Sequence, residues 1–144
     1  MDKLSRDEII TLFNDELITF ISELLKIFNQ INKNIPEESF NTIITYKNLI
    51  ETGIAINKEI GIEMFSVYIF SKANNEFSNK ISARDYEYFY NIEEDLNGQN
   101  HLIELIMIIK NLFRELSSEN QENIFGYLEN LCVLSNGYFL KKIT

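Results

Sequence analysis

One acidic stretch between two predicted helices carries oxygen-bearing side chains at the spacing of a calcium-binding loop. Glu93, Asp95, Asn97 and Glu104 fall at ligand positions of the pattern D-x-[DN]-x-[DN]-G-x5-E, and Gly98 falls at its sharp bend. Ca²⁺ prefers carboxylate and amide oxygens, so a calcium-responsive, EF-hand-like helix pair is one interpretation. A plain surface turn is favoured, because Glu93 is longer than the aspartate expected first and turns are rich in these residue types.

The residues that could support catalysis are few. His101 is the only histidine and Cys132 the only cysteine, so neither a second imidazole for a metal nor a second thiol for a disulfide exists. We interpret His101 as a polar residue of a surface turn. Cys132 lies between two apolar residues with no basic neighbour to lower the pKa of its thiol, and we expect it in the core. The glycines form no phosphate-binding loop. The sequence therefore predicts a protein that is not an enzyme, with no catalytic residue and no cofactor.

Aromatic residues crowd one short segment. Tyr86, Tyr88, Phe89 and Tyr90 fall within five positions, so on a helix they cannot all face one core. Burial of two and exposure of the others is the simpler interpretation. The alternative is that Tyr86, Tyr88 and Tyr90 contact a partner, because an amphipathic tyrosine ring is favoured at protein interfaces.

The elements that must position these residues are all predicted to be helices. Ser5 and Glu8 have the spacing of a capping box, and apolar residues then recur at steps of three and four as far as Ile31. Further helices are expected over about 36–51, 62–71, 82–92, 102–116 and 118–134. We expect Gly53 to end the second helix, Ser118 with Gln121 to cap the last one, and Asn136-Gly137 to end it.

Asn74, Asn75, Ser78 and Asn79 lie close together and are predicted to form a break between helices. No repeat or sustained strand alternation is present. The fold class is therefore predicted to be all-α, as a single compact bundle of five or six helices, with residues 1–144 forming one domain.

Charge and hydropathy narrow the expected partners and the compartment. The net charge is −9, from 13 Lys and Arg against 22 Asp and Glu, which disfavours nucleic acid and anionic membranes as partners. No apolar run approaches the roughly 20 residues of a transmembrane helix, and the first residues lack the features of a secretory signal. Together with a single cysteine, these features predict a cytoplasmic protein.

Short motifs follow one another over most of the chain. They are 13–17 (FNDEL), Phe20, 24–25 (LL), Phe65, Tyr68, Ile81, 84–85 (RD), Phe89, 109–110 (IK), 116–117 (LS), 119–120 (EN), Ile124 and 127–128 (YL). In this order they resemble a family of short, largely uncharacterised proteins of nucleocytoplasmic large DNA viruses. In similar sequences a proline follows the position of Phe28 and tryptophans stand at Phe113 and Phe125, whereas this chain has Asn29 and no tryptophan. The family brings no established activity or functional residue. The resemblance implies a viral protein that acts in the host cytoplasm or in the virion.

These observations lead to three functional hypotheses. The first is a non-enzymatic interaction or structural module that uses an apolar helix face or groove to bind a protein partner or itself, forming a homo-oligomer. The second is a viral helical adaptor that antagonises host defence, which the sequence does not separate from the first. The third is the calcium-responsive helix pair.

Overall fold

The computed structural model describes residues 3–30, 37–94 and 100–143. Over these residues it contains seven α-helices and two short 3-10 helices. They are α1 (Arg6–Gln30), α2 (Glu37–Ile56), α3 (Ile60–Ser71), η1 (Ala73–Asn75), α4 (Glu76–Ser82), α5 (Tyr86–Asn91), α6 (His101–Leu112), η2 (Phe113–Glu115) and α7 (Ser118–Ile143). The all-α prediction is confirmed, and the number of α-helices is higher than the five or six expected.

Helix α1 forms as its capping box and apolar stripe predict. The Ser5 N–H donates to Glu8 Oε1 and the Glu8 N–H donates to Ser5 Oγ, both at 3.1 Å. The stripe at steps of three and four is buried along the whole helix: Ile10, Phe13, Leu17, Phe20, Leu24 and Ile27. Burial of this stripe, rather than helix propensity alone, stabilises so long a helix.

Helix α2 does not end at Gly53, as we predicted, but continues to Ile56. Glycine costs about 1 kcal/mol relative to alanine in a helix interior, and the burial of neighbouring Ile50 offsets this cost. A Cβ placed on Gly53 would lie 3.5 Å from Ile60 Cγ2, so the glycine lies where α3 packs closely on α2. The connection to α3 is consequently only three residues long, 57–59.

The asparagine-rich segment predicted as a break contains helix α4. Its two apolar residues, Phe77 and Ile81, are four positions apart and fully buried, so they form one face of a short helix. Asn74 and Asn75 adopt left-handed φ values of 60° and 53° and make the sharp turn that precedes it. The sequence signal for a turn was correct, but it covers three residues rather than the whole segment.

Helix α7 differs from the prediction at both ends. Its capping side chain is Ser117, whose Oγ accepts from the Asn120 N–H at 3.1 Å, not Ser118. The Gln121 side chain instead donates to the Phe113 carbonyl at 2.9 Å. The helix continues through Asn136-Gly137 to Ile143, and Tyr138 beyond that pair is 2% exposed. Burial of Tyr138 outweighs the helix-ending tendency of the Asn-Gly pair.

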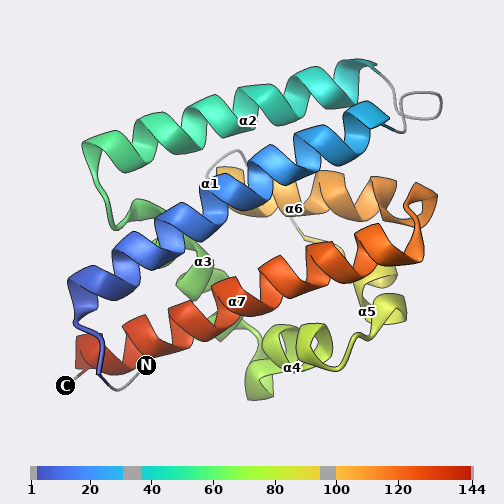
Figure 1. The fold of residues 1–144 in the computed structure, drawn as a ribbon. Coiled ribbons are helices and arrows are strands. Elements are labelled where there is room, and N and C mark those ends of the chain that lie inside the picture. Colours follow the sequence, from blue (N-terminus) through green and yellow to red (C-terminus); the bar gives the residue numbers. More distant parts are fainter. Residues whose placement is uncertain (1–2, 31–36, 95–99, 144) are drawn as a thin grey trace.

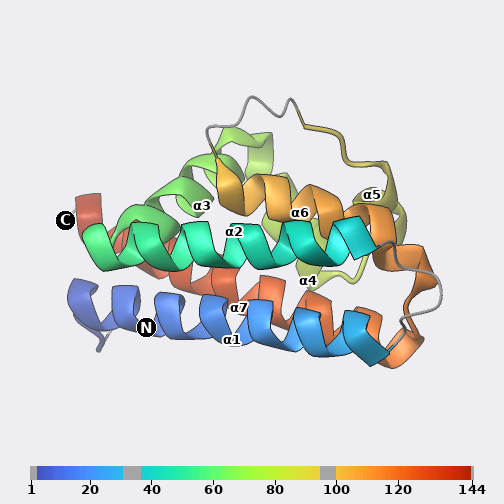
Figure 2. The same cartoon turned by 90° about the horizontal axis from the view of Figure 1, so that it is seen from above.

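The helices enclose one core. In Figure 1, α1 and α7 lie side by side across the bundle and run in opposite directions, and α2 packs along the other side of α1. Figure 2 shows α6 behind α2, with α3 beside it. Most residues of α6 are buried, including the polar Glu104. The start of α1 and the end of α7 lie together, since the Arg6 guanidinium is 5.4 Å from the centre of the Tyr138 ring.

A candidate interaction surface along helices α1 and α7

The line of contact between α1 and α7, here called the α1/α7 seam, is open to solvent on its outer side. Two contacts define its register. The rings of Phe20 and Tyr127 stack with centroids 5.2 Å apart, and Asn130 Nδ2 donates to Glu16 Oε1 at 3.3 Å. Phe20 is buried beneath the seam, whereas Glu16 and Asn130 lie at its surface. The floor of the seam is therefore core, and its rim is polar.

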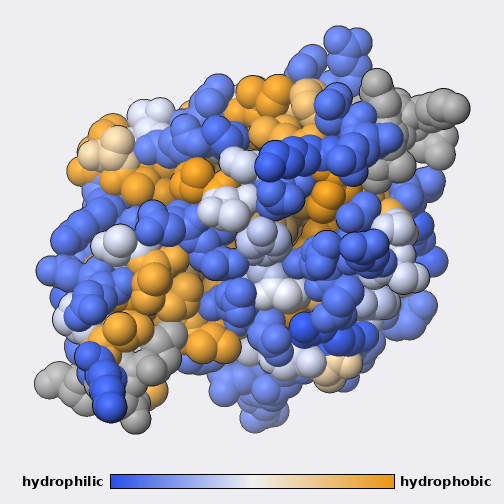
Figure 3. Space-filling view, in the orientation of Figure 1, coloured by the Kyte–Doolittle hydropathy of each residue, from blue (hydrophilic) through white to orange (hydrophobic). Residues whose placement is uncertain are grey.

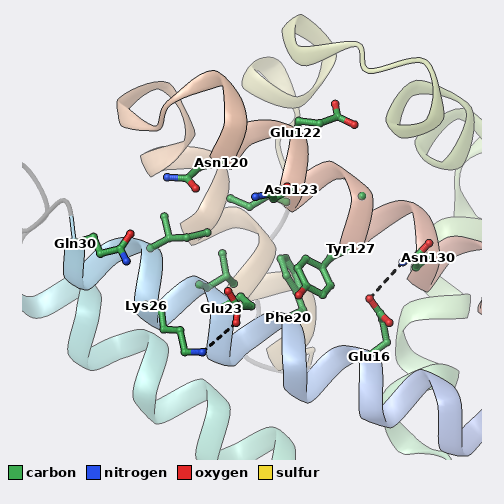
Figure 4. A pocket seen from close by; sticks show the side chains of 14 residues that line it. Glu16, Phe20, Glu23, Lys26, Gln30, Asn120, Glu122, Asn123, Tyr127 and Asn130 are labelled. Carbon is green, nitrogen blue, oxygen red and sulfur yellow. Dashed lines mark hydrogen bonds and ion pairs between the residues drawn. The ribbon is translucent and has the colours of Figure 1, made fainter.

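A groove of about 660 Å³ follows the seam between the C-terminal half of α1 and the N-terminal half of α7. Figure 4 shows its side chains, which come from both helices. Carboxamide groups make up much of the rim: Gln30, Asn120, Asn123 and Asn130. Each carboxamide both donates and accepts hydrogen bonds, so this rim can pair with a peptide backbone or with polar side chains.

The groove is acidic on balance. Its described lining residues include three carboxylates, Glu16, Glu23 and Glu122, and one ammonium group, that of Lys26. Lys26 Nζ lies 3.2 Å from Glu23 Oε1. Arg84 lies outside the groove, and its Nε is 2.9 Å from Glu122 Oε2. The pair of Lys26 with Glu23 is exposed, so it contributes little to stability and can be exchanged for other contacts at low cost.

Gly126 leaves part of the α7 backbone uncovered in the groove. A Cβ at this position would meet no heavy atom within 4 Å outside its own helix, so packing within the chain does not require a glycine. Glycine in a helix interior is destabilising by roughly 0.5–1 kcal/mol relative to alanine. The glycine therefore leaves the α7 backbone uncovered at this point of the groove.

Exposed apolar side chains continue the seam beyond the groove. Leu12 of α1 is 44% exposed, and Val133 and Leu140 of α7 are 49% and 58% exposed. Leu12 lies one helical turn from Glu16, and Val133 lies one turn from Asn130. Figure 3 shows apolar surface over this corner, where the start of α1 meets the end of α7. We call Leu12, Val133 and Leu140 the apolar corner.

The three tyrosines predicted to contact a partner are half-buried. The Tyr86 ring packs edge-on against Phe125 at 4.8 Å, and its hydroxyl donates to Glu122 of the groove at 3.4 Å. Tyr88 packs near Phe77 with ring centroids 6.5 Å apart.

Tyr90 lies under the Arg114 guanidinium, which is 4.0 Å from its ring centre. These rings cover the chain's own core, and contact of Tyr86, Tyr88 and Tyr90 with a partner stays a prediction.

The predicted calcium loop is described only in part. Asp95 and Asn97 lie outside the described residues. Glu93 is exposed, whereas Glu104 is buried and its Oε2 accepts from the Tyr46 hydroxyl at 2.5 Å. Over the part of the chain that the structure describes, no group of three or more His, Cys, Asp or Glu side chains is placed to hold a metal. Calcium binding stays a prediction, tested by comparing the melting temperature in millimolar calcium and in chelator.

The remaining candidate for chemistry is the thiol of Cys132. Its side chain is buried in the core as predicted. Burial raises the pKa of the Cys132 thiol to about 12, so the nucleophilic thiolate is scarce at neutral pH. This environment suits a packing role.

Sequence inspection missed the seam, although a signal for it exists. Glu16 and Glu23 on α1, and Asn123 and Asn130 on α7, are each seven residues apart, which places each pair on one side of its helix. Such spacing marks a polar helix face, but nothing in it indicates that the two faces lie next to each other.

Comparison with known proteins adds no further assignment, because the chain matches no protein-family model, no curated protein and no solved structure. Among the described residues, no helix combines the length and the apolar character required to span a bilayer.

Proposed function

We propose that this chain is a non-enzymatic protein-interaction module that binds a segment of a partner protein along the α1/α7 seam. The observation that carries the proposal is the continuity of two surfaces on the same pair of helices. An open polar groove occupies one half of the seam, and the exposed apolar corner occupies the other half. A segment lying along the seam would bury apolar surface at one end and form hydrogen bonds at the other.

The chemistry of the seam indicates the chemistry of the partner. The excess of carboxylates in the groove, on a chain of net charge −9, favours a segment that carries Lys or Arg. The apolar corner favours a few apolar side chains at the end of that segment nearest Val133. An amphipathic helix with one basic and one apolar part fits both requirements. Within this proposal, the resemblance to viral proteins implies a partner in an infected cell or in a virion.

Selection from a displayed library of random amphipathic helical peptides would test the proposal. We expect the selected peptides to be enriched in Lys and Arg and to bind the purified chain saturably in titration calorimetry. Gly126→Leu, which fills the groove without a change of charge, should weaken binding about tenfold or more, as loss of an interface hot spot does. Val133→Lys, which places a cation in the apolar corner, should have a similar effect.

Two control variants make the same changes elsewhere. Ala55→Leu adds an exposed leucine to α2, and Val67→Lys changes a valine of α3 that is 71% exposed. Both should bind the selected peptides as the original chain does. Equal binding by all four variants, or selected peptides without basic residues, would contradict the proposal that a basic segment binds along the α1/α7 seam.

A second copy of the chain is the alternative occupant of the α1/α7 seam, and the oligomeric state distinguishes it from a different protein. Light scattering of the unmodified chain over a range of concentrations should show a monomer if the seam is reserved for a different protein. A dimer that Gly126→Leu and Val133→Lys dissociate would show that a second copy occupies the seam, and would overturn the choice of a basic partner segment.

A further inference from the structure

A second recess lies where α1, α2, α3 and α6 meet. It has a volume of about 220 Å³, and apolar side chains form most of its wall, among them Leu17, Ile50, Ile54 and Met64. Its one polar lining residue in the described part of the chain is His101, the first residue of α6. An apolar recess with a single polar position is a common form of small-molecule site.

The recess opens to solvent beside two of its lining residues. Leu49 of α2 is 43% exposed, and the side chain of His101 is 39% exposed. Two glycines, Gly53 of α2 and Gly61 of α3, also line the recess, so no side chain from these positions fills it. A small molecule that enters past Leu49 therefore reaches the imidazole of His101 directly.

The two ring nitrogens of His101 have different surroundings. Nδ1 is buried, has no hydrogen-bond partner among the described residues and lies 3.9 Å from Glu104 Oε2. This carboxylate favours the neutral tautomer that carries its proton on Nδ1, because a lone pair on Nδ1 would face a negative charge. In that tautomer Nε2 accepts a hydrogen bond. Since Nδ1 is buried, Nε2 is the ring nitrogen that a molecule in the recess would meet.

We propose that this recess binds a small apolar molecule that carries one hydroxyl group, and that the hydroxyl donates a hydrogen bond to His101 Nε2. The volume limits the ligand: an apolar cavity of roughly 150 Å³ holds benzene, so 220 Å³ accommodates a substituted benzene ring. A hydroxyl suits the polar position, because it is neutral and needs only one acceptor for its proton. A carboxylate would be repelled by Glu104 and by the net charge of −9, and an ammonium would exchange its hydration for a single acceptor.

Para-cresol and its methyl ether are matched probes, because they share the ring and the oxygen atom and only para-cresol can donate a hydrogen bond. We expect para-cresol to bind saturably and to shift the methyl resonance of Met64, which lines the recess. The methyl ether should bind about three- to tenfold more weakly, which is the usual effect of one hydrogen bond between neutral groups. His101→Phe keeps an aromatic ring but removes the acceptor, so the affinity for para-cresol should fall to that for the ether.

Two further variants separate binding in the recess from binding elsewhere on the chain. Gly53→Leu places a side chain in the recess and should abolish the shift of Met64, whereas Ala55→Leu, at an exposed position two residues away, should leave it intact. Circular dichroism melting of each variant verifies that it folds, and the comparison of the two probes on the unmodified chain and on His101→Phe does not depend on Gly53→Leu.

Three outcomes would overturn the proposal. The first is binding of para-cresol that fails to saturate or that survives in folded Gly53→Leu. The second is equal affinity of the unmodified chain for para-cresol and its methyl ether. The third is a preference for para-cresol that persists in His101→Phe, which would show that the size of the ether, rather than its missing donor, weakens its binding.

Discussion

The α1/α7 seam and the contact between α2 and α6 are built alike but differ in what they leave unpaired. Both join antiparallel helices over buried apolar residues. Along the α1/α7 seam the polar side chains are exposed and already pair with one another, as Lys26 does with Glu23. Between α2 and α6 the carboxylate of Glu104 is buried, and its Oε1 has no hydrogen-bond partner among the described residues.

The difference shows that the same helix pairing can place its polar groups either in solvent or in the core. Exposed polar groups lose little free energy when a hydrogen bond to water or to a neighbouring side chain is replaced by another hydrogen bond. The polar contacts along the α1/α7 seam can therefore change at little cost. A buried carboxylate is costly to leave unpaired, so a single well-placed donor has a large effect there. The two contacts therefore differ in the free energy that an unpaired polar group costs.

The largest expected effect is the difference in stability between truncation of a residue on the floor of the α1/α7 seam and truncation of a residue on its rim. Phe20→Ala should lower the free energy of unfolding by about 3–5 kcal/mol, because it removes a ring that is 1% exposed and stacks on Tyr127. Urea denaturation measures the change. Glu23→Ala, on the exposed rim of the same helix, should stay within about 0.5 kcal/mol. Similar losses for both variants would mean that the rim, too, is part of the core.

A smaller loss of stability is expected when the helix cap near each of the two regions is removed. Ser117→Ala removes the cap of α7 and should cost about 1 kcal/mol. Asn100→Ala removes the cap of α6, where the Asn100 side chain accepts from the Ile103 N–H at 3.2 Å and also donates to the Met64 carbonyl. Its cost should be larger, up to about 2 kcal/mol, because these contacts are partly buried.

Thermal denaturation of both cap variants, with Ser118→Ala as the control, tests this order. Ser118→Ala should have almost no effect, because Ser117 supplies the observed capping bond. A loss of stability confined to Ser118→Ala would show that Ser118, as predicted from the sequence, caps α7.

The smallest effect appears only at alkaline pH and concerns Tyr46. Its hydrogen bond to Glu104, together with burial and the negative charge of Glu104, raises the pKa of Tyr46 to about 12. In the unfolded chain this pKa is about 10. Between these values the folded state retains a proton that the unfolded state has lost, so stability falls as the pH rises through this window.

Tyr46→Phe removes this titration and should make the alkaline fall in stability shallower, as measured by urea denaturation at a series of pH values above 9. Glu104→Gln retains the tyrosine but removes the charge that raises its pKa, and should also flatten the curve. An unchanged slope in both variants would show that Tyr46 titrates alike in the folded and unfolded chains.

Much of the architecture followed from local signals. The capping box of Ser5 and Glu8 and the stripe from Ile10 to Ile27 located α1 almost to the residue. The apolar neighbours of Cys132 correctly indicated a buried thiol. Caps and helical periodicity act over a few residues, so they can be seen in the sequence without knowledge of the fold.

Other features depended on contacts between segments far apart in the chain. Helix α4 forms because Phe77 and Ile81 are buried against other helices, and α7 passes Asn136-Gly137 because Tyr138 is buried at the start of α1. Likewise, sequence placed Glu104 in a possible calcium loop, whereas the structure pairs it with Tyr46, 58 positions away. The sequence by itself determined an all-α chain and its strongest helices. Only tertiary packing decided which polar faces meet, because burial depends on partners that no local pattern specifies.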